Sequence, residues 1–438
     1  MKLTIIGGGS YFTPLLLKGL AGFRDEIKVD QIALLDINQP NVERVAAYCR
    51  KLFDDIGLYP VDLVSTIDHQ LAIEGSDFII FTIRVGGLPA RVQDEKIPLK
   101  YGIGGDETMG PGGFANALRT IPVMVAYAQE IERWAPDAWV IPFTNPEGIL
   151  TEAILRHSHV KAIGLCTAPF GLLSGISRHL GVSRSRIMLD YIGLTHLGWV
   201  SAIRLDGRDI LSEVVQTALA REDYVSPYYP ADMLVHLKAI PAHWFFTMVG
   251  RDYPHWFYHQ CEVVIKQRSA PQTRAEELIA MQQELADRDF LSIPIQELEE
   301  KRRHQVLDEP VLSLISAIWN NKDEVHILDI PNGGCVPGFE PEMVIEMPAR
   351  VTRSGATPFA IQDLAPEVRG LMQMLKAYEQ LTIRAAMSGS YDAAIQALLT
   401  HPLVMAYDIA KPLLDDILEA NRPFLPDYWA DTVFKKNG

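Results

Sequence analysis

The chain has 438 residues, 48% of them hydrophobic, as in ordinary soluble globular proteins with two cores or one large core. Its 40 basic and 55 acidic residues give a formal net charge of −15, which argues against a nucleic acid or an anionic membrane surface as a partner. A signal-peptide pattern and apolar runs of membrane-spanning length are both missing, so we expect a cytoplasmic protein without membrane partners.

A glycine-rich turn near the N-terminus predicts a phosphate-binding site. The apolar run 3–6 predicts a strand, and the apolar segment 15–20 predicts the helix that follows. Between them lie four small residues, Gly7, Gly8, Gly9 and Ser10. Backbone N–H groups at such a strand-to-helix turn can bind an anion. The dinucleotide fingerprint Gly-x-Gly-x-x-Gly/Ala is matched only in part, because Phe12 occupies its last position.

A second predicted strand, over 31–35, ends in Asp36. A carboxylate there can accept hydrogen bonds from the ribose diol of a dinucleotide, although its spacing from the glycines is longer than the usual 20 or so residues. The alternative is a tight turn followed by an aspartate that caps the next helix.

Strands and helices alternate through the first part of the chain, which predicts a parallel, doubly wound sheet. Further strands are expected over 77–83, 138–143 and 162–165, with a helix over 114–133. We expect a Rossmann-like domain over 1–165 and a mainly helical α+β part over 166–438. The clearest helical periodicities of the second part lie over 274–285 and 371–399.

Polar residues follow the predicted strands at their carboxyl ends, where ligands bind in such sheets. Arg84, Asn145 and Cys166 each come directly after a strand, and the glycine-rich loop 84–113 adds Arg91. Any one of them could be an ordinary loop residue, but together they indicate a site.

Cys166 and His196 both stand at the end of a predicted strand. A thiolate and an imidazole suit a borderline divalent cation and leave positions open for substrate oxygens. A single cysteine and a single histidine more often have structural roles, so spacing alone leaves both interpretations open. The remaining cysteines, Cys49, Cys261 and Cys335, have no paired spacing and argue against a disulfide framework.

Several motifs in one order resemble glycoside hydrolase family 4, and the resemblance runs nearly from end to end. The motifs are Gly7-Gly8-Gly9-Ser10, Arg84-Val85-Gly86-Gly87-Leu88, Glu107-Thr108, Gly110-Pro111-Gly112-Gly113, Thr144-Asn145-Pro146, Gly164-Leu165-Cys166, Gly193-Leu194-Thr195-His196, Asn332-Gly333-Gly334 and Ile345-Glu346-Met347-Pro348. The resemblance implies a fold like that of lactate and malate dehydrogenases. It also implies a glycosidase that uses NAD without consuming it, an exception to the two-carboxylate rule.

The family chemistry implies a role for each matching residue. NAD+ takes a hydride from C3 of the sugar, a divalent metal (usually Mn2+) polarises the C3 oxygen, and a tyrosine removes the C2 proton. Elimination at C1, addition of water and return of the hydride complete the cycle. The implied nucleotide site comprises Gly7 to Ser10 with Asp36, and Cys166 and His196 match the metal ligands. Asn145, with Arg84 and Arg91 for a 6-phosphate, would bind the substrate.

Which residue stands at the position of the catalytic tyrosine depends on how the sequence is aligned with the family. Counting from Ile240-Pro241 places Trp244 at the position of the base, whereas aligning back from the downstream motif Thr273-Arg274-Ala275 places Tyr253 there. We prefer Tyr253, because this alignment keeps the longer stretch in register.

Three residues depart from the family pattern and bear on the substrate. Thr167 stands where β-specific members have asparagine and α-specific members aspartate, and threonine is a poor acid. Thr195 and Asp106 replace an expected asparagine and glutamine. The leading hypothesis is therefore a 6-phospho-β-glucosidase. The alternatives are a family member for another sugar (an α-galacturonide, α-glucoside or α-galactoside), a plain NAD-dependent sugar or hydroxy-acid dehydrogenase, and a nucleotide-binding relic. The family also implies a homodimer or homotetramer.

Overall fold

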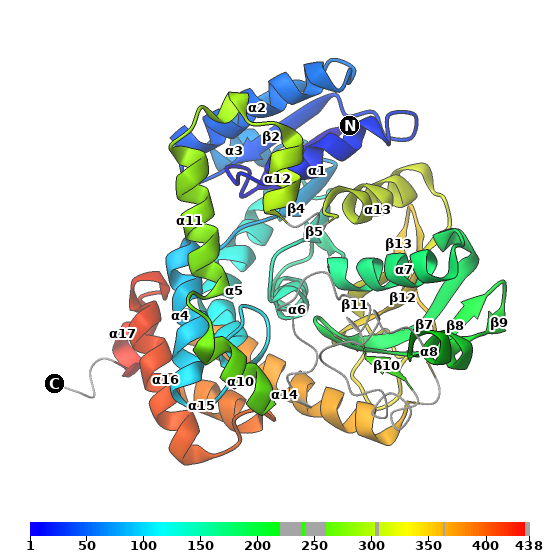
Figure 1. Cartoon of the computed structure of the whole chain (residues 1–438). Helices are drawn as coiled ribbons and strands as arrows, with labels where there is room; N and C mark the ends of the chain where they lie inside the picture. Colours follow the sequence, from blue (N-terminus) through cyan, green and yellow to red (C-terminus); the bar gives the residue numbers. More distant parts are fainter. Residues whose placement is uncertain (220–238, 242–259, 303–305, 362–363, 434–438) are drawn as a thin grey trace.

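Six parallel strands form the N-terminal sheet, in the order β3-β2-β1-β4-β5-β6 (Figure 1). They are β1 (Lys2–Ile6), β2 (Gln31–Leu35), β3 (Asp62–Thr66), β4 (Phe78–Phe81), β5 (Trp139–Pro142) and β6 (Lys161–Ala162). This computed structural model describes residues 1–219, 239–241, 260–302, 306–361 and 364–433. The strand order reverses between β1 and β4, and in such sheets ligands bind beyond the carboxyl ends of the strands at this point. The predicted Rossmann-like sheet is confirmed.

Helices cover both faces of this sheet, which explains why its strands are nearly continuous apolar runs. They are α1 (Thr13–Leu17), α2 (Gln39–Asp55), α3 (His69–Ile73), α5 (Gly110–Trp134) and α6 (Glu147–His157), and α4 (Gly87–Lys100) packs on α5. In α2 the side chain of Asn38 caps the N-terminus by accepting from Asn41 N, and the buried face includes Cys49, a core residue as predicted.

A second, antiparallel sheet of seven strands lies in the C-terminal part. Its main path is β10-β8-β7-β12-β11, with β9 beside β8 and β13 beside β12. The strands are β7 (Ile187–Leu194), β8 (Leu197–Leu205), β9 (Arg208–Asp209), β10 (Ile240–Pro241), β11 (Glu324–Pro331), β12 (Val344–Thr352) and β13 (Gly355–Pro358). The helices around it are α7 (Thr167–Leu180), α8 (Leu211–Leu219) and α13 (Asp308–Asn320).

The remaining C-terminal helices run along the N-terminal part (Figure 1). They are α10 (Gln260–Ser269), α11 (Arg274–Ala286), α12 (Ile295–Lys301), α14 (Pro366–Ser388), α15 (Tyr391–Thr400), α16 (Tyr407–Asn421) and α17 (Tyr428–Val433). Helices α11 and α16 pack on α4, and α14 packs on α5. One large hydrophobic cluster therefore spans both parts, and the boundary at 165/166 stays a prediction. None of the described helices is long and apolar enough to cross a membrane.

The periodic stretch 371–399 forms two helices instead of one. Gly389 ends α14 in the left-handed conformation at φ 67°, and Ser390 then caps α15 by accepting from Ala393 N at 3.1 Å. Glycine adopts a positive φ without steric cost, and serine is a favoured cap, so these two residues stop one helix and start the next.

Candidate active site

The glycine turn is fixed by tight packing between neighbouring strands. Gly7 has φ 95°, and a Cβ there would lie 2.8 Å from the carbonyl carbon of Thr82. Gly7 N and Gly8 N both donate to the carbonyl oxygen of Leu35, at 2.8 and 2.9 Å. These two N–H groups therefore hold the turn against β2 and are paired within the protein, whereas the sequence predicted backbone N–H groups that bind an anion.

Asp36 lies beside this turn, as the sequence predicts. Its Oδ2 accepts from Gly9 N at 2.9 Å, and its Oδ1 accepts from Asn38 N at 3.0 Å. A Cβ on Gly9 would come within 2.8 Å of the same carboxylate, so only glycine allows this approach. Ser10, the last residue of the turn, accepts from Phe12 N through its Oγ at 3.3 Å.

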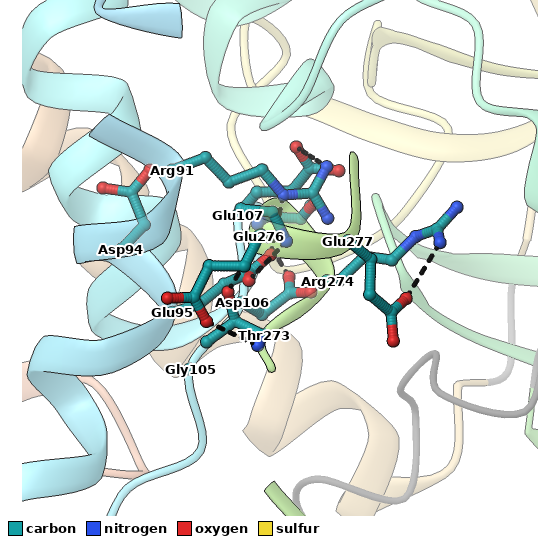
Figure 2. Close-up of polar contacts among 12 residues, drawn as sticks. Arg91, Asp94, Glu95, Gly105, Asp106, Glu107, Thr273, Arg274, Glu276 and Glu277 are labelled. Atoms are coloured by element: carbon teal, nitrogen blue, oxygen red, sulfur yellow. Dashed lines mark hydrogen bonds and ion pairs between the residues drawn. The ribbon is translucent and has the colours of Figure 1, made fainter. Parts of the chain in front are cut away.

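A cluster of arginines surrounds Glu107. Arg84, after β4, and Arg91, on α4, both form ion pairs with Glu107 Oε2, the second at 2.8 Å. Figure 2 shows the Arg91 side chain reaching from α4 toward Glu107. Burial opposes ionisation of Glu107, but the charges of Arg84 and Arg91 lower its pKa to about 2. The two arginines predicted from the sequence are therefore brought together.

Arg302, after α12, joins this cluster and was missed by the sequence analysis. Its guanidinium carbon lies 4.9 Å from the ring centroid of Phe12, so it connects the cluster to the glycine turn. Burial lowers the pKa of Arg302 to about 10, and the charge of Arg91 adds to the effect while Glu107 opposes it. The only signal in the sequence was Phe12 itself, where the fingerprint expects a small residue.

Glu95 ties Arg91 to the C-terminal part of the chain (Figure 2). Its Oε1 accepts from Arg91 Nε at 2.7 Å, and its Oε2 accepts from the backbone N of Ala275 at 2.9 Å, in the first turn of α11. Thr273 and Glu276 form a capping box at the same helix start. A carboxylate at a helix N-terminus is favourable, so Glu95 orients Arg91 and anchors α11 at once.

Cys166 lies beside a group of buried carboxylates, and His196 lies near Glu107 and Arg91. Cys166 is the N-cap of α7, and burial, together with the carboxylates Glu346 and Asp329, raises its pKa well above the ordinary value. His196 lies in the turn between β7 and β8, where burial lowers its pKa to about 4 and keeps its imidazole neutral. A neutral imidazole and a thiol that loses its proton on binding are suitable ligands for a divalent cation, with the neighbouring carboxylates favouring positive charge.

The carboxylates themselves were not predicted as site residues. Glu147 begins α6, and Asp329 on β11 lies directly opposite Glu346 on β12. All three are buried, and burial together with their mutual repulsion raises the pKa of Glu147 and of Glu346 well above the ordinary value. Tyr191 OH donates to Glu346 Oε2. No local motif unites these residues, because they come from three separate elements.

The other predicted substrate residues lie at neighbouring strand ends. Asn116 Nδ2 donates to the backbone carbonyl oxygen of Asn145 at 2.8 Å and to that of Glu107 at 3.1 Å. The Asn116 side chain therefore links the loop of Asn145 to the loop of Glu107. Thr167 is the first residue of α7 and is half-buried. Tyr253 and Trp244, the two candidates for the base position, lie outside the described residues.

Comparison with known proteins gives a family for the whole chain. The model of the family 4 glycosyl hydrolases matches residues 2–182, and that of the family 4 glycosyl hydrolase C-terminal domain matches residues 191–404. A "Probable 6-phospho-beta-glucosidase" of Bacillus subtilis is 34% identical over 98% of both chains.

Solved structures agree with this result. The 6-phospho-beta glucosidase of Thermotoga maritima, solved with manganese, NAD+ and glucose-6-phosphate, superposes with a TM-score of 0.86 at 27% identity, covering 97% of this chain and 99% of that one. The malate dehydrogenase of Cryptosporidium parvum shares the fold alone, with a TM-score of 0.55 at 15% identity over 88% of this chain and 99% of its own. The expected dehydrogenase-like fold is thus confirmed, and the chain belongs to glycosyl hydrolase family 4.

Proposed function

We propose that this protein hydrolyses 6-phospho-β-glucosides with the help of NAD and a divalent metal ion. The observation that carries the proposal is the buried arginine cluster, which lies between the glycine turn and the candidate metal ligand His196. Glu107 and Arg91 both affect the pKa of His196, so the cluster and this ligand are neighbours.

The arginine cluster has the properties of an anion site. Three guanidinium groups, of Arg84, Arg91 and Arg302, share two carboxylates, those of Glu95 and Glu107, which leaves an excess of positive charge. Within the described part of the chain, buried Arg84 Nη1 and Arg302 Nε have no hydrogen-bond acceptor. Buried polar donors normally have partners, so these two point to a ligand that supplies anionic oxygens. A sugar phosphate suits them, because guanidinium groups bind phosphate with matching geometry.

The other residues take complementary roles around the sugar ring. When bound, NAD accepts and returns a hydride, and a divalent cation polarises a substrate oxygen. Asp36 would accept from the ribose, and Cys166 and His196 would hold the metal. Asn145 would orient the sugar. Tyr253 remains our predicted base for the proton next to the oxidised carbon.

Thr167 favours a β-linked substrate. Its hydroxyl is too weak an acid to protonate a leaving group, which an α-specific enzyme with aspartate at this position relies upon. The names of the Bacillus subtilis and Thermotoga maritima relatives agree with the β assignment. A glycosidase for another sugar is the principal alternative.

The decisive assay is nitrophenol release from p-nitrophenyl 6-phospho-β-D-glucoside with NAD+, Mn2+ and a thiol reductant, each omitted in turn. Loss of activity on omission of NAD+ or Mn2+, with no net NADH, supports the proposal. The α-anomer and the unphosphorylated glucoside test the sugar assignment. Activity confined to either of them, or stoichiometric NADH from the sugar, would contradict it.

We also propose a cytoplasmic homodimer or homotetramer. The segment 244–258, rich in aromatic residues, and the C-terminal helices suit a buried interface. Light scattering after size-exclusion chromatography measures the mass directly, and a monomer at micromolar concentration would refute this state.

A further inference from the structure

The turn that carries His196 has an unusual backbone. Only Thr195 and His196 separate β7 from β8, and His196 has φ 65°, in the left-handed region. A non-glycine residue keeps this conformation only where its surroundings hold it. The position of the imidazole therefore depends on contacts made by the rest of the turn.

The Thr195 hydroxyl supplies such contacts. It accepts from the backbone N of Gly148 at 2.8 Å, and it lies 3.2 Å from Glu147 Oε2 and 3.1 Å from Asp329 Oδ1. One hydroxyl proton can be donated to only one carboxylate at a time, while the oxygen accepts from Gly148. The turn, the start of α6 and the middle of β11 meet at this single atom.

Gly148 is adapted to this contact. A Cβ at position 148 would lie 2.7 Å from Thr195 Oγ1 and 3.1 Å from Asp329 Oδ1, so only glycine lets the hydroxyl approach the backbone. Gly148 follows the Asn145-Pro146-Glu147 segment directly. The hydrogen bond therefore couples the loop of the candidate substrate residue Asn145 to the turn of the candidate metal ligand His196.

We infer that Thr195 is a positioning residue, which fixes His196 and the Asn145 loop relative to each other for metal and sugar binding. The inference rests on the proposed function in taking His196 as a metal ligand. Thr195 replaces the asparagine that the family resemblance led us to expect, so this arrangement belongs to this chain's own sequence. Loss of a contact that orients a metal ligand commonly lowers metal affinity by about 10- to 100-fold.

The test compares Thr195→Val, which removes the hydroxyl with little change in shape, with Thr195→Ser, which keeps it. Thr151→Val is the matched control, because buried Thr151 also donates to Glu147, at 2.8 Å, but does so from within α6 and is not part of the turn. Mn2+ affinity is measured by the electron paramagnetic resonance signal of free Mn2+, without substrate or turnover. NAD+ affinity and the circular dichroism spectrum verify that each variant is folded.

We expect about tenfold weaker Mn2+ binding for Thr195→Val, and binding near that of the unaltered protein for the other two variants. Unchanged affinity in Thr195→Val, or an equal loss in Thr151→Val, would overturn the inference. If the unaltered protein binds Mn2+ yet hydrolyses no phosphoglycoside, the proposed function fails alone. If it binds no Mn2+, both fail.

Discussion

Arg119 and Asp94 form a fully buried ion pair whose removal should weaken both the fold and the substrate site. Arg119 Nη1 and Nη2 donate to the two Asp94 oxygens at 2.8 and 2.5 Å, and both side chains are 0% exposed. Arg119 Nε also donates to the carbonyl of Val85 at 2.8 Å, next to Arg84, and Nη1 donates to Asn421 Oδ1 at 2.9 Å, at the end of α16. One side chain therefore joins α4, α5, α16 and the Arg84 loop.

The expected loss is large because a charge would be left buried alone. Burial raises the pKa of Asp94, and Arg119 counteracts this effect. Breaking such a pair by removing one partner costs about 3–5 kcal/mol, against a total stability of about 5–15 kcal/mol. Arg119→Met should therefore lower the free energy of unfolding by about 3 kcal/mol or more. Because Asp94→Asn removes the stranded charge, the double variant should lose about 1–3 kcal/mol less than the sum of the single losses.

Urea denaturation followed by circular dichroism measures these differences. The control is Arg204→Met, which breaks the ion pair between Arg204 and Asp190. The side chains of this pair are 37% and 34% exposed, so its loss should lower the free energy of unfolding by less than about 1 kcal/mol. In active variants the Michaelis constant for the phosphorylated substrate should rise, because the carbonyl next to Arg84 loses its donor. A loss below about 1 kcal/mol for Arg119→Met, with additive effects in the double variant, would refute the reasoning.

Three further predictions concern the site and the pH response. Arg84→Met should raise the Michaelis constant for a 6-phosphorylated glycoside about tenfold or more, as expected for a lost charged hydrogen bond, and Lys96→Met should not. Equal effects on an unphosphorylated glycoside would contradict the phosphate role. Asp36→Ala should weaken NAD+ binding about tenfold and NADP+ binding much less, measured by titration calorimetry, and equal losses would contradict the ribose contact. Burial raises the pKa of Glu379 from 4.5 to about 7, although Lys376 opposes the shift, so the folded state holds this proton more tightly than the unfolded state. The free energy of unfolding should then fall by about 3 kcal/mol as the pH rises from 4.5 to 7. Glu379→Gln should flatten this part of the urea-denaturation profile, and an unchanged slope would show that another group titrates.

The sequence alone determined the N-terminal fold and the strand ends where polar residues gather. Alternating apolar segments predict a parallel sheet, and parallel strands place their carboxyl ends at one edge, so the neighbourhood of Gly9, Asp36, Arg84 and Asn145 followed from periodicity and spacing. These inferences succeed because each depends on short stretches of chain.

Only the tertiary structure decided which distant groups meet. Arg302 lies on Phe12, Glu95 caps α11 while holding Arg91, and Asp329 faces Glu346 across two paired strands. No local pattern predicts these contacts, because Arg302, Glu95 and Asp329 are ordinary charged side chains until packing removes them from water. Once such a side chain is buried, its free energy and its pKa depend on which group it pairs with. Burial is a property of the assembled core, so it cannot be read from any single segment of the sequence.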